Sequence, residues 1–273
     1  GAGDIPAEWQ TAYGVHVIPI NIHFANKTYL QGVELSNRDF YGLIEQTGRI
    51  PQTSQPSPQQ FMDFYRGFAQ PGDTILSIHV TSKLSGTFAS AEAAARDMGG
   101  EIQVIPFDSA CGSAGMGFMC KEAGDLNRAG ASLEKILDRL NFIRDRIQIV
   151  LTLNTLEYAR MSGRVKALQA ALASLLNVKP VVVLRQGVLE LADRIRTRQK
   201  ALDFVVKRVQ DVVGNKPVNI AVVNAEDPAT GELLLSKVRN VFNYRELIAT
   251  DLSISVAANL GPGTVGVVAY ALE

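Results

Sequence analysis

Apolar and polar positions in the middle of the chain alternate between runs of strand length and helical stretches. An apolar, β-branched run at residues 74–80 predicts a strand, and the alanine-rich residues 86–95 predict the helix that follows it. The same alternation continues through strands expected at 101–107 and 148–153, with helices expected at 112–127 and 132–142. This order is typical of a parallel sheet with helices on both faces.

The residues before this stretch predict smaller elements. Strands are expected at 15–18, 20–24 and 28–30, the last two forming a hairpin arm, and Ser36 caps a helix that reaches about residue 46. Ser57, Pro58 and Gln60 form a capping box with proline at the first helical position. A helix therefore begins there, and residues 53–55 are expected to be a loop.

The regular alternation of strands and helices ends at about residue 150. The elements expected beyond this point are helices at 165–177, 197–213 and 229–243, a hairpin over 178–194, a strand at 218–223 and extended segments at 246–250, 253–258 and 264–270. We therefore predict an α/β protein of two domains. Residues 1–150 would form a parallel-sheet α/β domain, and residues 151–273 a second α/β domain with an antiparallel or mixed sheet.

Residues 81–87, between the first of these strands and its helix, are rich in hydroxyl groups. They include Ser85 and end at Gly86 and Thr87. Free N–H groups and the positive helix dipole at such a junction favour an anion. The same residues are also typical of an ordinary capped turn, and the loop alone leaves both interpretations open.

Composition narrows the classes of function. The chain has 273 residues, 47% of them hydrophobic, and 27 basic side chains balance 27 acidic ones. This balance argues against a nucleic-acid binder, and no apolar run is long enough to span a membrane. Two cysteines are expected to be reduced thiols, and the three histidines are not spaced as metal ligands with them. We expect a cytoplasmic protein without a metal site.

Standard catalytic signatures are absent from the sequence, including Walker, nucleophile-elbow and dinucleotide-binding motifs. Ser85 and His79 keep a stand-alone serine hydrolase open as an alternative. A histidine within a strand is nevertheless more typical of a half-buried structural residue.

Positive charge is concentrated between Arg160 and Lys200. Nine basic residues stand there against two acidic ones, an excess of seven charges. Arg160, Arg164, Arg196 and Arg198 could face a phosphate or an acidic partner surface, or they could form an ordinary solvated face. The same stretch keeps a phosphoryl-transfer enzyme open as an alternative to a binding protein.

Eight short motifs follow one another along nearly the whole chain. They are T-S-Q-P-S from Thr53, S-x-L-S-G-T from Ser82, D-S from Asp108, T-L-E-Y from Thr155, G-R from Gly163, L-L-N-V-K-P from Leu175, R-T-R from Arg196 and G-P-G from Gly261. In this order they resemble the DegV family, the bacterial fatty-acid-binding proteins that serve as ligand-carrying subunits of fatty acid kinase.

The resemblance implies a lipid-binding subunit that has no catalytic residue and no cofactor and that buries one long-chain fatty acid. The hydroxyls of Thr53 and Ser85 would hold the carboxylate, and the neighbouring ligand-binding positions would be Ser54, Gly86, Asn259 and Leu260. A separate fatty acid kinase catalytic subunit would phosphorylate that carboxylate, and the acyl phosphate would pass to phospholipid synthesis. Transient contact with a membrane surface would fit this role.

Two features depart from the family pattern. Family members usually begin with a strand ending in I-V-T-D-S, just before the segment that matches residues 1–6, so we expect the printed sequence to lack that strand. The family often has His-Thr before G-P-G, where this chain has Asn259 and Leu260. Asparagine can donate a hydrogen bond but carries no charge.

Overall fold

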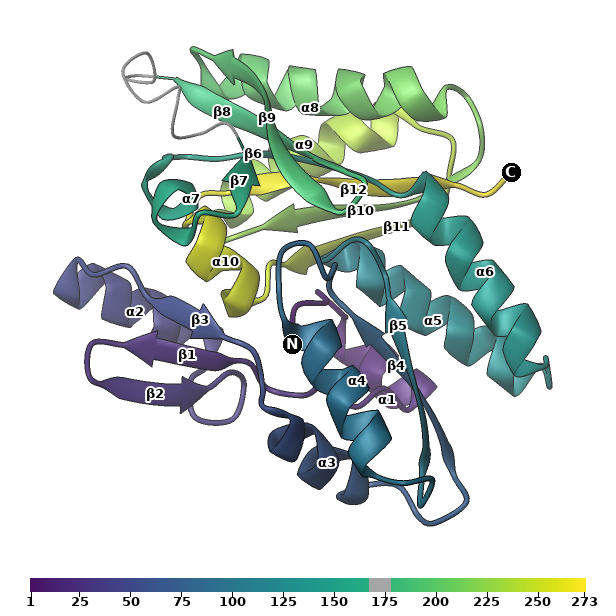
Figure 1. Ribbon diagram of the computed structural model, residues 1–273. Coiled ribbons are helices and arrows are strands. Elements are labelled where there is room, and N and C mark those ends of the chain that lie inside the picture. Colours follow the sequence, from purple (N-terminus) through teal and green to yellow (C-terminus); the bar gives the residue numbers. More distant parts are fainter. Residues whose placement is uncertain (167–177) are drawn as a thin grey trace.

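The computed structural model describes residues 1–166 and 178–273, and these residues form three β-sheets with helices packed against them (Figure 1). A parallel pair of strands and a separate mixed sheet confirm the predicted α/β fold class. In Figure 1 the early part of the chain lies below the large sheet, and both termini are visible.

A small antiparallel sheet has the order β2-β1-β3. Its strands β1 (Asn21–Phe24) and β2 (Lys27–Leu30) form the predicted hairpin arm. Strand β3 (Gln52–Ser54) replaces the loop that was expected at 53–55, because Thr53 pairs with Ile22 of β1. The capping box at Ser57 specifies where the next helix begins, but it carries no information about pairing with a distant strand.

Local capping signals place three helices close to their expected positions. Helix α2 (Asn37–Thr47) begins after Ser36, and α6 (Leu133–Arg146) begins after Ser132. Helix α3 (Pro58–Arg66) has the full capping box: Ser57 Oγ accepts from Gln60 N over 3.2 Å, and Gln60 Oε1 accepts from Ser57 N over 2.9 Å. A short helix α1 (Ala7–Tyr13) precedes them.

The predicted strand–loop–helix stretch consists of β4 (Thr74–His79), a turn, and α4 (Thr87–Asp97). Strand β4 pairs in parallel with β5 (Gln103–Asp108), and α5 (Ala114–Arg128) follows. Helices α3 and α4 share a buried cluster with residues beside β5, formed by Phe61, Tyr65, Ala69, Ala91, Ala94, Met98 and Ile102. This packing fixes the direction in which the turn before α4 points.

Strand β6 (Gln148–Thr152) does not continue the parallel sheet that the alternation of elements predicts. It lies between β12 (Val265–Ala271) and β8 (Lys179–Arg185), antiparallel to both, in a seven-stranded sheet of order β11-β10-β12-β6-β8-β9-β7. The partners of β6 come from distant parts of the chain, so its local pattern could not specify the sheet. The division into domains near residue 150 stays a prediction.

The remaining strands of the large sheet are β7 (Val165–Lys166), β9 (Val188–Ile195), β10 (Val218–Asn224) and β11 (Tyr244–Asp251). Helices α8 (Arg198–Val213) and α9 (Pro228–Val241) cover one face through a core rich in valine and leucine. Helices α5 and α6 pack against the other face, as Figure 1 shows.

Three further expectations from local pattern are wrong. Residues 253–258 belong to helix α10 (Ile254–Leu260) rather than to an extended segment. Val165 and Lys166 form β7 instead of opening a helix, and the rest of that expected helix, 167–177, lies outside the described residues. Residues 15–18 form no strand, since pairing begins at Asn21. A short helix, α7 (Glu157–Ser162), precedes β7.

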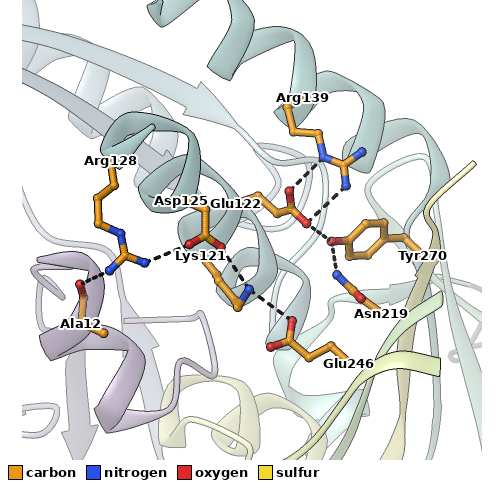
Figure 2. A network of polar contacts seen from close by, with 9 residues as sticks. All are labelled: Ala12, Lys121, Glu122, Asp125, Arg128, Arg139, Asn219, Glu246 and Tyr270. Carbon is orange, nitrogen blue, oxygen red and sulfur yellow. Dashed lines mark hydrogen bonds and ion pairs between the residues drawn. The ribbon is translucent and has the colours of Figure 1, made fainter. Parts of the chain in front are cut away.

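A polar network joins the helices of the first half of the chain to the large sheet (Figure 2). Arg139 on α6 donates twice to Glu122 on α5, over 3.0 and 3.2 Å, and Tyr270 Oη on β12 donates to Glu122 Oε1 over 2.7 Å. Burial alone would raise the pKa of Glu122, but the bonds from Arg139 and Tyr270 lower it overall. The carboxylate therefore stays ionised and fixes α5 against the sheet.

Candidate functional site

One small cavity collects residues from three separate elements. Thr53 on β3, Arg164 after α7 and Asn259 on α10 line a cavity of about 160 Å³. The other lining residues are Ile50, Pro51, Gln52, Met161, Ser162 and Ala258, so Arg164 is the only charged residue among them. Pockets for whole drug-sized ligands start at roughly 300 Å³, so this cavity suits a head group.

The guanidinium of Arg164 is half-buried, and within residues 1–166 and 178–273 its hydrogen-bond partners are all neutral oxygens. It donates to Asn259 Oδ1 over 2.7 Å, to Leu84 O over 3.3 Å and to Ser162 O over 3.2 Å. Burial lowers the pKa of Arg164, and no carboxylate of the described residues pairs with it to offset that cost. A cation taken out of water without a counter-ion is unfavourable, so the cavity favours an anion.

Thr53 lines this cavity, whereas the next residue of β3, Ser54, does not. Ser54 Oγ is bonded to His23 Nε2 over 2.7 Å, and His23 Nδ1 is bonded to Thr28 Oγ1 over 2.9 Å. The Thr53 hydroxyl makes no hydrogen bond to the residues that the structure describes, which leaves it available to a ligand.

Ser85 and Gly86 lie next to the T-S-Q-P-S segment. A Cβ built on Gly86 would lie 2.8 Å from Nε2 at the end of the Gln55 side chain, so the two loops are in close contact at this point. Ser85 Oγ is bonded to Thr87 Oγ1 over 2.7 Å and accepts from Thr87 N over 3.3 Å. Arg164 links this turn to the cavity through its bond to Leu84 O.

Asn259 and Leu260 are adjacent in sequence but have different environments. The Asn259 amide donates to Ser255 O over 2.6 Å while its oxygen accepts from Arg164, so both ends of the side chain are fixed. Leu260 is buried in the main core and does not line the cavity. Of this predicted pair, the structure brings Asn259 alone to the cavity.

The four predicted basic residues are not gathered on one surface. Arg164 lines the cavity, whereas Arg160 and Arg196 are exposed. Arg198 is half-buried: it pairs with Asp227 Oδ2 over 3.0 Å and also donates to Gly263 O in the G-P-G turn. Arg198 thus has an internal contact that joins the start of α8 to the turn after α10.

His79 is not placed to activate Ser85. Its Nε2 is bonded to Ser77 Oγ over 2.8 Å, and Ser77 Oγ is bonded to Tyr65 Oη over 2.8 Å. Burial, followed by the nearby amino terminus, lowers the pKa of His79 to about 3, although Asp108 opposes this shift. The Ser85 hydroxyl instead contacts Thr87, so these groups lack the nucleophile–base pair that a serine hydrolase requires.

A larger cavity, of about 640 Å³, follows the outer edge of β4. All residues from 74 to 80 line one side of it, and residues 14–18 line the other. Consecutive strand residues alternate between faces, so the cavity borders the backbone edge of β4. Strand β5 occupies the opposite edge, and no described strand pairs with this one. Unpaired peptide groups suit another strand and are a poor wall for an acyl chain.

Sequence reasoning missed part of the site. Met161 and Ser162 line the cavity because α7 ends beside it, and no pattern in the sequence distinguishes them from other helix-end residues. Gln186 and Gly187 contact the turn before α4, as described below. Their spacing predicts the hairpin, but nothing local indicates what the hairpin touches.

The described residues contain neither a cluster of metal-binding side chains nor a membrane-spanning helix. No three histidine, cysteine, aspartate or glutamate side chains gather as a metal site within residues 1–166 and 178–273. Over the same ranges, no helix is both long and apolar enough to traverse a bilayer.

Comparison with known proteins covers the chain from end to end. The family model for "Uncharacterised protein, DegV family" matches residues 1–272. A DegV domain-containing protein of Deinococcus radiodurans is 32% identical over 269 residues, which are 97% of this chain and 94% of that protein. Protein DegV of Bacillus subtilis is 29% identical over 265 residues, covering 96% of this chain and 94% of the relative.

Solved structures are similar over the same extent. A structure described as "Fatty Acid Binding of a DegV family Protein from Thermus thermophilus" superposes with a TM-score of 0.89 at 31% identity, covering 99% of this chain and 97% of that one. DegV of Bacillus subtilis, described as a fatty acid binding protein, gives a TM-score of 0.88 at 27% identity and covers 99% and 96%.

Proposed function

The chain belongs to the DegV family, and from this premise we propose that it binds a long-chain fatty acid and holds the carboxylate in the cavity between Thr53, Arg164 and Asn259. Solved relatives described as fatty acid binding proteins support the ligand class. The position of the head group is supported by the side chains that line the cavity.

One observation carries the proposal: Arg164 is a half-buried cation that has only neutral partners within the described residues. A ligand carboxylate would supply the missing negative charge, and guanidinium–carboxylate pairs are among the strong hydrogen-bonded contacts in proteins. The unbonded Thr53 hydroxyl would donate to the same anion. Ser85 would contribute from the neighbouring turn, as the resemblance to the family implies.

Most of the affinity would come from the tail. Burying each methylene contributes about 0.8 kcal/mol, so a long chain offers roughly 10 kcal/mol before the cost of association. Ile50, Met161 and Ala258 give the cavity an apolar side where the chain would begin. The polar groups would then orient the head group and select for an acid.

We also propose that the protein presents this carboxylate to a separate kinase rather than transforming it. The Ser85 hydroxyl has no histidine partner in the described structure, which supports a binding role. Arg160 and Arg196 are exposed and could meet an acidic or phosphate-bearing partner surface. Catalysis, acyl-phosphate formation and its use in phospholipid synthesis would belong to the partner proteins.

Native mass spectrometry of the purified protein, followed by lipid extraction, tests this function. We expect the wild-type protein to carry one fatty acid and the double variant Thr53→Ala, Ser85→Ala to carry markedly less. Ser82→Ala is the matched control, because Ser82 is exposed on the same turn as Ser85. Full occupancy in the double variant, or a wild-type protein that neither carries nor takes up fatty acid, would contradict the proposal.

A further inference from the structure

The β8–β9 hairpin ends in a two-residue turn formed by Gln186 and Gly187. Arg185 pairs with Val188 across it, and both turn residues have positive φ, 48° and 79°. Positive φ at both central positions is the signature of a type I′ turn, which matches the twist of the flanking strands. The position of this tip is therefore set by the large sheet.

The tip contacts the turn before α4 at two points. Thr81 Oγ1 donates to Gly187 O over 3.0 Å in a buried position, and Lys83 Nζ donates to Gln186 O over 2.8 Å at the surface. A Cβ on residue 187 would collide with Thr81 Oγ1, so glycine is required for the close approach as well as for the turn.

Thr81 connects this contact to Ser85. The backbone N–H groups of Leu84 and Ser85 both donate to Thr81 O, over 3.1 and 3.3 Å, and close a tight turn. Arg164 Nε donates to Leu84 O on that same turn. Residues 81–85 are thus held between the hairpin tip and Arg164, both of which come from the second half of the chain.

We infer that the Gln186–Gly187 turn is a positioning element that holds residues 81–85 where Ser85 and Arg164 can meet one carboxylate. The inference rests on the proposed function, since it concerns the same head group. Gln186 and Gly187 do not line the cavity and would act through Thr81. The contact should therefore govern selectivity for an acid over a neutral head group, whereas burial of the tail should not depend on it.

The test compares the dissociation constants of palmitic acid and of hexadecanol, which share a tail and differ in the head group. For the wild-type protein we expect the acid to bind about tenfold to a hundredfold more tightly, because only the acid makes charge-assisted hydrogen bonds. In Thr81→Val, which removes the hydroxyl donor to Gly187, this ratio should fall about fivefold while hexadecanol binding stays unchanged.

Two more variants keep the experiment decisive if Thr81→Val folds poorly. Lys83→Met removes the surface bond to Gln186 O and should lower the ratio about twofold, as expected for a weak exposed bond. Gln186→Asn keeps the backbone contacts and places a favoured residue in the turn, so the ratio should stay at the wild-type value.

The outcomes separate the two proposals. If the wild-type protein binds acid and alcohol equally well, the carboxylate site itself is wrong. If the wild-type protein discriminates, but Thr81→Val and Lys83→Met discriminate as well as Gln186→Asn does, the hairpin does not position the head group. Equal loss of affinity for both lipids in Thr81→Val would likewise overturn the inference, because it would indicate a purely structural role.

Discussion

The guanidinium of Arg164 donates to the side-chain oxygen of Asn259 over 2.7 Å, and the amide of Asn259 is held in turn by Ser255 O over 2.6 Å. A neutral asparagine can accept this bond without adding charge to the cavity. Arg164 is therefore the only charged residue among the described residues that line the cavity, and its contribution can be measured separately from that of its neighbours.

Replacing Arg164 with glutamine should weaken binding of palmitic acid about tenfold to a hundredfold, because a charge-assisted contact is lost while hydrogen bonding to Asn259 remains possible. Titration calorimetry or displacement of a fluorescent fatty acid gives the dissociation constants. Arg160→Gln is the matched control, since Arg160 is exposed on the preceding helix. Equal affinities in the two variants would remove Arg164 from the site.

Arg196 and Arg198 should respond differently to charge reversal. Arg198→Glu places a second carboxylate beside Asp227 and removes the bond to Gly263 O, so it should lower the free energy of unfolding by about 1–3 kcal/mol. Arg196→Glu changes an exposed residue and should leave that free energy unchanged while slowing association with a kinase partner. Urea unfolding of the two variants provides the comparison, and similar losses in both would contradict it.

Acidification should destabilise the protein through His79. The folded protein keeps this histidine neutral, with a pKa of about 3 against an ordinary value of 6.5, so the unfolded chain takes up the proton first. The stability that His79 contributes is complete above pH 6.5 and is lost as the pH falls toward 3. Between pH 7 and pH 5 this loss amounts to about 2 kcal/mol.

The variant His79→Gln isolates this effect, because glutamine can keep a bond to Ser77 but does not titrate. Urea unfolding at pH 7 and pH 5 should show a larger loss for the wild-type protein than for the variant. Other titrating groups, such as Asp4, are common to both proteins and cancel in the difference. If the free energy of unfolding falls equally in the wild-type protein and in His79→Gln between pH 7 and pH 5, His79 is not the responsible group.

An extended apolar segment joined ahead of Gly1 should stabilise the fold. Gly1 lines the cavity along β4, and Ala2 lies at the carboxyl end of that strand near Val80, so such a segment would run parallel to β4. Each kcal/mol gained would raise the melting temperature by about 2–4 °C in a protein of this size. Amide hydrogen exchange should also slow in β4.

A glycine- and serine-rich segment of the same length is the control, because it has little tendency to form a strand. If both extensions leave the melting temperature and the exchange of β4 unchanged, the cavity does not accept a strand.

Elements whose ends are encoded locally could be predicted from the sequence. The capping box at Ser57 and the β1–β2 hairpin depend on residues a few positions apart, and both occur as expected. Helix α10 could not be predicted in this way. The β-branched Ile254 and Val256 favour a strand, yet the segment is a helix whose Ala257 and Ala258 are buried in the core.

In the candidate site, too, some features could be predicted from local sequence and others depend on contacts between distant residues. Thr53, Ser85 and Asn259 could be proposed from motifs, and the structure places Thr53 and Asn259 on one cavity with the turn of Ser85 beside it. The role of Arg164 could not be separated from that of the other arginines, because they share one basic stretch of sequence. Burial and partners distinguish them, and both depend on contacts between residues far apart in the chain.

The contact between the tip of the β8–β9 hairpin and Thr81 has a consequence for recombination between related proteins. A chimera that takes residues 1–150 from this protein and the remainder from a family member would contain Thr81 and Ser85 but a foreign hairpin tip and a foreign counterpart of Arg164. Each parental segment could fold and still yield a hybrid with a misaligned head-group site. A chimera that keeps the head-group site intact would have to take the turn at 81–85 and the hairpin tip at 186–187 from the same parent protein.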